Sequence, residues 1–325
     1  MEQMLACCTR LGKLFSALRE EDSVVERACR ENPWFTPREV VGAAHVLAQR
    51  MLDGDELRAW LAHYPMLPVK IPRRVGLIMA GNIPFVGFFD LLCLWVAGHR
   101  ALLKPSSKDR VLMEWVVEQL LELDPQCPVE WLDEGSQPLE AVIATGSDNA
   151  LRHFRSTYGS LPALLRGSRQ SVAVLDGSES EEELRGLGRD IFTYSGLGCR
   201  NVSLLFLPEG LEPRIEMPEM NPLYGQNYRQ ERALATLLGR PYRDLGGALL
   251  MEDEGFSSAL SVITIRRYRI LAEVEQWLEE HDREVQCVVG RAVNHPRGVA
   301  FGEAQNPGLM EYPDAVDVLA FLAKL

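Results

Sequence analysis

Apolar residues recur at two different spacings along the chain, and the spacing changes near residue 70. In the first part they lie three to four positions apart, as Leu11, Leu14 and Phe15 do, which is the spacing of one face of a helix. The four residues that begin with Thr36 are typical of a helix start, because threonine caps the first amides and the proline after it is tolerated there. The pattern predicts a helical N-terminal segment, residues 1–70, that associates with the domain after it.

Short apolar runs alternate with helical segments from residue 71 to residue 168. The pattern predicts strands at 75–80, 101–103, 129–132 and 141–144 and helices at 85–97 and 109–123. The helix at 85–97 is apolar on all sides, which indicates burial. Strands that alternate with helices in this way predict a parallel sheet with both faces covered.

A second alternating set occupies residues 169–305. It predicts strands at 172–175, 201–207, 259–265 and 285–289 and helices at 179–187, 231–238 and 270–280, with a loop and no element at 213–227. A chain of 325 residues also exceeds the usual size of one hydrophobic core. The predicted fold class is α/β, with two parallel-sheet α/β domains, the helical N-terminal segment and a C-terminal tail of residues 306–325.

Composition and charge exclude several classes of protein. The net charge of −12 disfavours a nucleic-acid partner, which would need a surplus of cations on one face. No apolar run reaches the ~18 residues of a membrane span, and the N-terminus lacks the basic and then apolar order of a signal peptide. We therefore expect a cytoplasmic protein without a membrane span. The seven cysteines lack the paired spacing of a zinc site, so we expect no metal.

Four short motifs at the ends of predicted strands have the residue types of a ligand site. They are Ala80-Gly81-Asn82-Ile83-Pro84, Lys104-Pro105-Ser106-Ser107, Thr145-Gly146-Ser147 and Ser195-Gly196-Leu197-Gly198-Cys199. Open α/β sheets place their ligands at strand ends. Each motif taken alone is equally explained by the preference of turns for Gly, Pro and Ser. Their order and spacing along the chain make the set informative.

Cys199 is the candidate nucleophile among the cysteines. Two glycines before it let a ligand approach the backbone closely, and Arg200 beside it favours a thiolate. The alternative is a buried structural cysteine, which is the usual state of a free cysteine in a reducing compartment. That alternative suits Cys93, Cys127 and Cys287 better, and Cys93 in particular because it lies inside the apolar helix.

In these motifs the chain resembles the aldehyde dehydrogenase superfamily and, within it, the acyl-CoA reductases of the LuxC type. The resemblance extends from Val75 to the C-terminus and includes Glu254-Gly255-Phe256, Phe301 to Pro307 and Tyr312 to Leu319. It implies an aldehyde dehydrogenase-like fold with an NADP-binding Rossmann-like domain at 71–168 and a catalytic domain at 169–305. It also implies reduction of an acyl thioester, such as a fatty acyl-CoA, to an aldehyde through a thioester on Cys199.

The resemblance assigns roles to residues of the first three motifs. Asn82 would supply an oxyanion-hole donor, a contribution typically worth ~3 kcal/mol of barrier, and its alternative role is that of a turn residue. Lys104 would contact the adenosine ribose, and otherwise is an exposed surface lysine. Ser107 stands where relatives that prefer NAD commonly carry an acidic residue. Serine would not repel a 2′-phosphate, which favours NADPH as the cofactor.

Five further residues complete the implied cofactor site, and each group of them has an alternative role. Thr145, Gly146 and Ser147 end a strand and begin a helix whose first amides could face a pyrophosphate, although Ser147 could equally be a plain helix cap. Glu254 would bond the nicotinamide ribose and Phe256 would pack near the ring. The alternatives are a surface glutamate and a core phenylalanine.

One departure from the superfamily narrows the reaction. Hydrolytic aldehyde dehydrogenases place a glutamate base in a Glu-Leu-Gly-Gly turn, whereas the matching stretch here, Leu165 to Arg169, has no carboxylate. Without a base to activate water, an acyl-cysteine hydrolyses slowly and survives until hydride or a second thiol attacks it. The departure favours thioester reduction over oxidation of aldehydes to acids.

Other readings of the sequence stay open. The donor could be acyl-CoA or an acyl carrier, and glutamyl-phosphate reductases, which reduce acyl phosphates, share the scaffold. An acyl-transfer or scaffolding subunit could keep the fold without the redox step. The hairpin that usually mediates oligomer contacts has no obvious room between Tyr64 and Val75, so a homo-oligomer or a partner subunit is left open.

Overall fold

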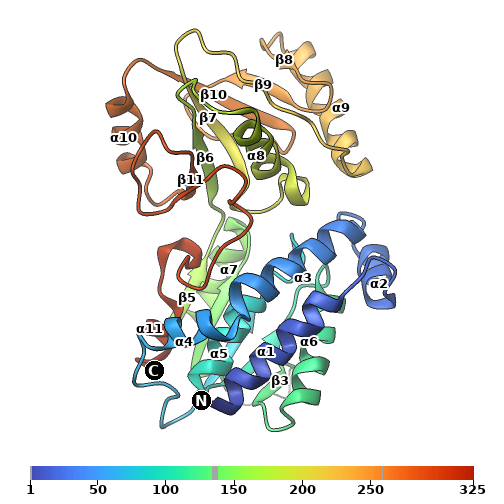
Figure 1. Cartoon of the computed structure of the whole chain (residues 1–325), viewed down its shortest axis with the longest axis vertical. Coiled ribbons are helices and arrows are strands. Elements are labelled where there is room, and N and C mark those ends of the chain that lie inside the picture. Colours follow the sequence, from blue (N-terminus) through green and yellow to red (C-terminus); the bar gives the residue numbers. More distant parts are fainter. Residues whose placement is uncertain (1, 134–137, 258) are drawn as a thin grey trace. The chain divides into compact units, whose positions relative to one another are not determined.

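Two compact units make up the computed structural model, which describes residues 2–133, 138–257 and 259–325 (Figure 1). Unit 1 consists of residues 1–168 and 308–325, and unit 2 consists of residues 169–307. The chain therefore passes from one unit to the other twice. None of the described helices is long and apolar enough to cross a membrane.

Four helices begin unit 1. They are α1 (Glu2–Ala17), α2 (Ser23–Glu31), α3 (Pro37–Met51) and α4 (Gly54–Leu61). The helix start predicted at Thr36 is confirmed, because its hydroxyl accepts a hydrogen bond from the Glu39 amide at 3.2 Å. α1 packs against α3, and the two run side by side in Figure 1. Leu11 and Phe15 of α1 are buried, so the helical spacing marks the packed face.

A parallel five-stranded sheet forms the core of unit 1, in the order β3-β2-β1-β4-β5. The strands are β1 (Arg74–Ile78), β2 (Arg100–Lys104), β3 (Val129–Trp131), β4 (Ala141–Thr145) and β5 (Ala163–Arg166). The helices between them are α5 (Phe88–Ala97), α6 (Arg110–Leu123) and α7 (Asp148–Tyr158). The strand order reverses between β1 and β4. Such a switch point leaves a crevice outside the carboxyl ends of the strands.

α5 begins at Phe88 rather than at Phe85, so the predicted start of this helix is wrong. Phe85 has a φ of 57°, in the left-handed region that a helix interior does not contain, and the turn after β1 continues to Gly87. Every residue of α5 is buried, as its apolar pattern predicts. A strained turn therefore separates β1 from the helix that fills the core.

The end of the chain, residues 308–325, belongs to unit 1. It contains two short elements, η2 (Pro313–Ala315) and α11 (Val318–Leu322). Trp60 donates a hydrogen bond to the Tyr312 hydroxyl at 2.8 Å, and Tyr64 donates one to the Asp317 carboxylate at 2.7 Å. These bonds join the end of the chain to α4 and the turn that follows it.

Unit 2 is built on a seven-stranded sheet in the order β12-β11-β6-β7-β10-β9-β8, in which only the β8–β9 pair is antiparallel. The strands are β6 (Gln170–Val174), β7 (Val202–Pro208), β8 (Arg243–Asp244), β9 (Leu249–Glu252), β10 (Val262–Tyr268), β11 (Val285–Val289) and β12 (Gly298–Val299). The helical elements are α8 (Glu181–Phe192), η1 (Thr193–Gly196), α9 (Pro222–Leu237) and α10 (Leu271–Glu280). Trp277 of α10 packs on Phe206 of β7, with ring centroids 5.1 Å apart, so α10 covers one face.

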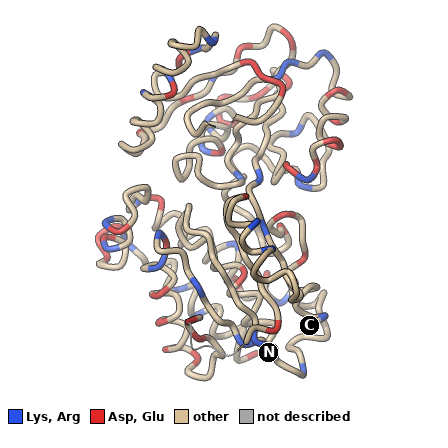
Figure 2. The backbone as a smooth tube through the Cα atoms, turned by 180° about the vertical axis from the view of Figure 1, so that it is seen from behind, with Lys and Arg blue, Asp and Glu red and all other residues tan. Residues whose placement is uncertain are grey.

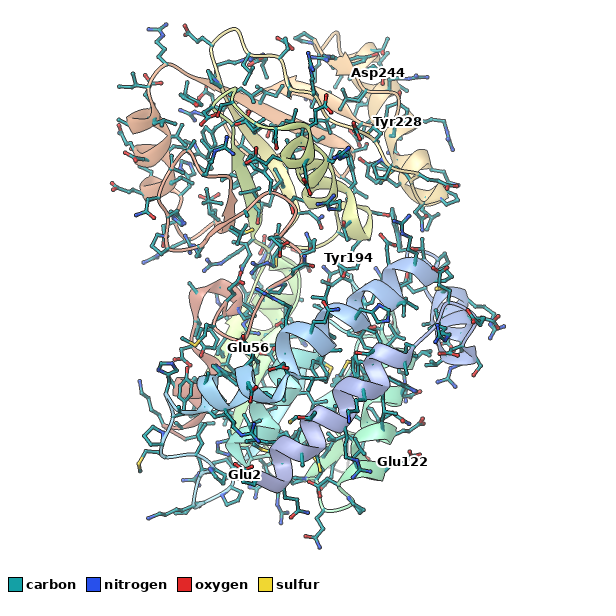
Figure 3. The ribbon with its side chains drawn as sticks, in the orientation of Figure 1. Glu2, Glu56, Glu122, Tyr194, Tyr228 and Asp244 are labelled. Carbon is teal, nitrogen blue, oxygen red and sulfur yellow. The ribbon has the colours of Figure 1, made fainter. Side chains whose placement is uncertain are left out.

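The predicted loop at 213–227 is wrong from residue 222 onward. α9 begins there with proline in its first turn, and the Asn221 side chain accepts a hydrogen bond from the Leu223 amide at 2.8 Å. Asparagine followed by proline is a helix-start signal, so the sequence contained this information. Tyr228 of α9 donates its hydroxyl to Asp244 of β8 at 2.6 Å, and Figure 3 labels both residues.

Acidic and basic residues are interspersed over both units in Figure 2. Many of them pair, as Arg269 does with Glu209 at 2.8 Å and Arg243 with Glu212 at 2.7 Å. Exposed pairs of this kind contribute at most about 1 kcal/mol each. The stability of each unit therefore rests mainly on its buried apolar core.

Candidate active site

Three of the four motifs meet at the carboxyl edge of the unit 1 sheet. The Asn82 loop follows β1, Lys104 ends β2, and Thr145 ends β4, and β1 lies between the other two strands. The strands are in register there, with Ile78 opposite both Lys104 and Ala144. The motifs therefore surround the switch point of the sheet, where open α/β folds bind ligands.

The Asn82 loop is held in a strained conformation. Phe85, three residues after Asn82, is left-handed, and its amide donates to the Asp109 carboxylate at 3.3 Å. Asp109 is 2% exposed and precedes α6 without capping it. Gly81 packs so closely on the next loop that a Cβ there would lie 2.7 Å from the Ser106 hydroxyl oxygen. Asn82 itself is half-buried on this fixed loop.

Lys104 and Ser107 are both exposed at this edge. Their loop is fixed from behind, because the buried Asn32 side chain donates to the Lys108 carbonyl at 3.1 Å. The Lys108 amide also donates to the Ser106 hydroxyl at 3.3 Å. An ammonium and a hydroxyl are thus presented to solvent from a loop whose backbone is anchored.

The third motif begins α7, whose first residues are exposed. Ser147 caps this helix by accepting a hydrogen bond from the Ala150 amide at 3.3 Å. The Gly146 amide donates a hydrogen bond to the Arg166 carbonyl at 3.1 Å. The Asp148 carboxylate accepts a hydrogen bond from the Ser168 amide at 2.9 Å. Helix starts carry amides without intrahelical partners and a positive partial charge, so an exposed one suits an anion.

The stretch that matches the glutamate-base turn lies at the end of β5. Leu165 packs against apolar residues of the sheet, and Arg166 is buried in an ion pair with Asp90 at 2.6 Å. Asp90 pairs with Arg166, and the Asp148 carboxylate accepts the Ser168 amide hydrogen, so both of these carboxylates are already bonded to the stretch. No acid from 165–169 stands ready to activate water.

The Cys199 loop lies at the amino end of a strand, whereas the other three motifs lie at carboxyl ends. It follows α8 and η1 and precedes β7, so it lies at the amino edge of the unit 2 sheet. All four motifs therefore lie at strand ends, but this loop precedes its strand whereas the other three follow theirs. Tyr194, labelled in Figure 3, Ser195 and Gly196 are consecutive left-handed residues, with φ values of 56°, 54° and 71°.

Buried polar side chains fix the backbone around Cys199. The Ser171 hydroxyl donates to the Cys199 carbonyl at 3.0 Å and accepts a hydrogen bond from the Cys287 amide at 3.1 Å. Asn201 accepts the Gly198 amide hydrogen at 2.8 Å. These roles of Ser171, Asn201 and Asp109 are not predicted by the sequence, because nothing in the local sequence shows which backbone groups they bond.

Exposure separates Cys199 from the other cysteines, and burial raises the pKa of four of those others. All seven lie in the described part of the chain, and Cys199 is the exposed one. Burial raises the pKa of Cys8 and Cys127 to about 12 and that of Cys29 to about 11. Burial also raises the pKa of Cys93 well above its ordinary value. Since the thiolate is the nucleophile, these four thiols are poor candidates.

The Phe301 to Pro307 motif packs against α8, beside the cysteine loop. Asp190 of α8 accepts hydrogen bonds from the Gly302 and Ala304 amides at 2.6 and 3.0 Å. Burial raises the pKa of Asp190 to about 7, although these two amides oppose the shift. Arg200 donates its Nε to the Ala304 carbonyl, so its side chain is directed to this motif.

Glu254 and Phe256 lie away from Cys199 within unit 2. They follow the carboxyl end of β9, whereas Cys199 precedes the amino end of β7, which runs parallel through β10. Glu254 is 85% exposed and pairs with Arg266 at 2.9 Å, beside a cavity of about 450 Å³. Phe256 packs on Trp277 with ring centroids 5.5 Å apart. Their roles toward the nicotinamide stay predictions, and the structure does not bring them together with Cys199.

The unit 1 residues form one set and Cys199 another. Asn82, Lys104, Ser107 and Thr145 to Ser147 lie at a single sheet edge, and Cys199 lies at an edge of the other sheet. Among the described residues, no three or more His, Cys, Asp or Glu are grouped to hold a metal. The geometry thus offers an anchored, exposed thiol and a separate set of groups suited to a nucleotide.

Comparison with known proteins gives one family and one fold. The family model described as acyl-CoA reductase (LuxC) matches residues 46–223, and no curated protein matches the sequence. An oxidoreductase from Marinobacter aquaeolei is 14% identical with a TM-score of 0.65, covering 94% of this chain and 78% of its own. An NAD-dependent aldehyde dehydrogenase from Sinorhizobium meliloti is 13% identical with a TM-score of 0.64, covering 90% and 70%.

A succinic semialdehyde dehydrogenase from Streptococcus pyogenes, solved in complex with NADP+, is 12% identical with a TM-score of 0.64, covering 90% of this chain and 78% of its own. At these identities the solved structures show the fold alone. The predicted α/β, aldehyde dehydrogenase-like fold is confirmed.

Proposed function

This chain belongs to the acyl-CoA reductase (LuxC) family, as its motifs predicted, and from that premise we propose that it reduces a fatty acyl thioester to an aldehyde with NADPH. Membership makes it a reductase of acyl and aldehyde chemistry. The proposed substrate is an acyl thioester of CoA or of a carrier, the proposed reductant is NADPH, and the proposed nucleophile is Cys199.

The observation that carries this proposal is the state of Cys199. It is the exposed cysteine, at the tip of a turn whose backbone is anchored by Asn201 and Ser171. Strained backbone persists where the surroundings hold it, and such places are commonly functional. The three consecutive left-handed residues before Cys199 are therefore best explained as part of a nucleophile loop.

The first half of the reaction uses the thiolate of Cys199. Its sulfur attacks the acyl carbonyl, a new carbon–sulfur bond forms, and the bond to the leaving thiol breaks, so that CoA or carrier thiolate departs and takes a proton. Asn82 is the proposed oxyanion donor, because it stands on the anchored loop after β1 and its amide can donate to a developing negative charge.

In the second half the acyl carbon gains a hydride, which is the chemistry that NADPH would supply when bound. The resulting thiohemiacetal on Cys199 then collapses, the carbon–sulfur bond breaks, and the aldehyde leaves while the thiolate is restored. The carboxyl edge of unit 1 fits such a nucleotide on three observations: an exposed lysine, an exposed serine in place of an acid, and an exposed helix start at α7. Lys104 would hold the ribose, Ser107 would leave room for the 2′-phosphate, and the first amides of α7 would face the pyrophosphate.

Water should compete poorly for the acyl-cysteine. Leu165 is packed in the sheet and Arg166 is paired with Asp90, so neither can activate water. General-base help typically supplies ~10²–10⁴ in rate, and its absence leaves the thioester to hydride or to a second thiol. The arrangement supports reduction rather than hydrolysis.

A mass spectrum of the intact protein tests the proposal directly. The protein is incubated with acyl-CoAs of increasing chain length, without NADPH, and the expected result is a single stable adduct of one acyl mass. Adding NADPH should discharge the adduct as aldehyde, and adding CoA should discharge it as acyl-CoA. Free fatty acid is measured in the same samples, and its release should be slow.

Each other outcome points to a different function. Rapid release of acid would indicate a hydrolytic dehydrogenase or a thioesterase. An adduct that exchanges with CoA and does not respond to NADPH would indicate an acyl transferase. An adduct formed from acyl phosphates and not from thioesters would move the substrate to that class.

A further inference from the structure

The turn that carries Cys199 is closed from both sides by one residue, Asn201. The backbone amide of Asn201 donates to the Gly198 carbonyl at 3.1 Å, and its Oδ1 accepts the Gly198 amide hydrogen at 2.8 Å. The first and last residues of a four-residue turn are thus joined by reciprocal bonds. Cys199 lies inside this turn, so the direction in which its side chain leaves the backbone is fixed.

The other end of the Asn201 side chain is bonded to the end of α8. Its Nδ2 lies 3.1 Å from the carbonyl oxygens of Asp190 and Ile191 and 2.9 Å from that of Thr193. An amide nitrogen has two hydrogens, so one of them is shared between two carbonyls. The carbonyls in the last turn of a helix have no intrahelical partners, and Asn201 serves two of them in α8 and a third at the start of η1.

The segment between these two sets of bonds contains the strained residues. Tyr194 and Ser195 are both left-handed although neither is glycine, and both are buried. Asn201 is 4% exposed, so water does not compete effectively for its bonds. One buried side chain therefore spans the strained segment, from the end of the helix to the nucleophile turn.

We propose that Asn201 is a positioning residue, which acts through the Gly198 backbone to aim the Cys199 thiolate at the acyl carbonyl. The inference rests on the proposed function, because it concerns the attack of that thiolate on an acyl thioester. A misplacement of ~1 Å can cost ~10²-fold in rate even when no catalytic group is lost. The expected effect of Asn201 is therefore on orientation, not on binding or on the acidity of the thiol.

Two reactions of the same thiol separate orientation from reactivity. Acylation by a bound thioester requires one direction of attack, whereas alkylation by iodoacetamide reports the thiolate fraction and the exposure of the sulfur. Both are followed by intact mass, with Cys199→Ala as the blank for the other cysteines. Asn201→Ala removes every side-chain bond, and Asn201→Asp retains an acceptor for the Gly198 amide.

We expect Asn201→Ala to lower the acylation rate at saturating acyl-CoA at least tenfold. The KM for acyl-CoA should stay within threefold, and the alkylation rate and its pH midpoint should stay near those of the wild type. Asn201→Asp should lie between the two in acylation. Asn221→Asp is the matched control, because Asn221 is a buried asparagine of the same unit that caps α9, and both of its rates should be unchanged.

Unchanged acylation in Asn201→Ala would overturn the inference. Equal losses in acylation and alkylation would also overturn it, because Asn201 would then control exposure or ionisation of the thiol. If the alanine variant does not fold, the acylation and alkylation rates of Asn201→Asp are compared instead. That comparison is made at a pH above the midpoint of its alkylation, so that the thiol is ionised. A wild-type protein that is alkylated at Cys199 but acylated by no thioester rejects the proposed function, and the inference with it. If the wild type is acylated, the variants test the role of Asn201 separately from the proposed function.

Discussion

The Asn82 loop of unit 1 and the Cys199 loop of unit 2 both contain left-handed residues, but different side chains hold them. In the Asn82 loop the amide of Phe85 is held by the carboxylate of Asp109. In the Cys199 loop the corresponding part is played by Asn201, a neutral amide. One loop is therefore held by a group that can gain or lose a proton, and the other by a group that cannot.

The surroundings of the two loops differ in the same sense. Phe85 packs in an aromatic cluster with Phe15 and Trp115, at centroid distances of 5.2 and 6.3 Å, so apolar contacts carry much of that loop. Burial raises the pKa of Asp109 well above its ordinary value, although the amides of Phe85 and Val86 oppose the shift. The bonds by which Asn201 holds the Cys199 loop should therefore not change with pH, whereas the bond between Asp109 and the Asn82 loop should.

Replacement of the nucleophile should have the largest effect. Cys199→Ala is expected to abolish both the acyl adduct and aldehyde formation, because no other exposed thiol is present among the seven cysteines, all of which are described. Cys93→Ala is the control, and since Cys93 is fully buried it should change the thermal midpoint alone. Activity retained by Cys199→Ala, measured as adduct and aldehyde, would remove the unit 2 loop from the mechanism.

Loss of the oxyanion donor should come next. Asn82→Ala is expected to lower the acylation rate by ~10²–10³, the usual cost of one such donor. Asn82→Asp keeps the shape of the side chain but replaces the donor with an acceptor, so it should be at least as slow. Rates are measured from single turnovers at saturating acyl-CoA. A variant within threefold of the wild type would leave Asn82 as a turn residue and break the parallel between the loops.

The buried elements of this fold could be predicted from apolar patterns. The strand at Val285 to Val289 was predicted to the residue, and the cap at Thr36 was also correct. These predictions succeed because burial and capping are written into consecutive residues. β5 and β9 were missed although turn residues stand on both sides of each, because an apolar run this short shows no clear period.

The supports of the candidate site could not be predicted in the same way. Asp109 bonds a residue 24 positions earlier, and Ser171 bonds residues 28 and 116 positions later. Asp109 follows a turn and precedes a helix, so its sequence context predicts an ordinary cap, which it is not. Contacts between distant segments decide these roles, whereas the motif residues themselves were visible because they interrupt the apolar pattern.

A charge at Ser107 should change the choice of cofactor more moderately. Ser107→Glu is expected to shift the ratio of kcat/KM for NADPH and NADH about tenfold toward NADH, which corresponds to about 1.4 kcal/mol, because a carboxylate would repel the 2′-phosphate. Ser107→Ala, which adds no charge, should stay within twofold of the wild type. A wild-type preference for NADH would show that the serine does not select NADPH.

The last prediction concerns stability rather than rate and tests the comparison of the two loops itself. Because the pKa of Asp109 is raised in the folded state, its contribution to stability is complete below its unfolded value of ~3.9 and is lost as pH rises through the folded value. Asp109→Asn cannot titrate, so the free energy of unfolding of the wild type minus that of the variant should fall as pH rises. The fall should amount to ~1.4 kcal/mol for each unit by which the pKa is raised.

The measurement is the thermal or denaturant midpoint of unit 1 from below pH ~3.9 upward, for the wild type and for Asp109→Asn. Amide exchange at Phe85 is the local readout. Asp190, whose pKa burial raises to about 7, contributes a trend of the same sign, but it is present in both proteins and cancels in the difference. Exchange at Gly198, which Asn201 holds, should show no such dependence on residue 109. A difference that stays constant with pH would mean that the Asp109 carboxyl does not change its protonation state over the range. The hydrogen bonds that hold both loops would then be independent of pH, and the loops would differ only in which residue, Asp109 or Asn201, makes those bonds.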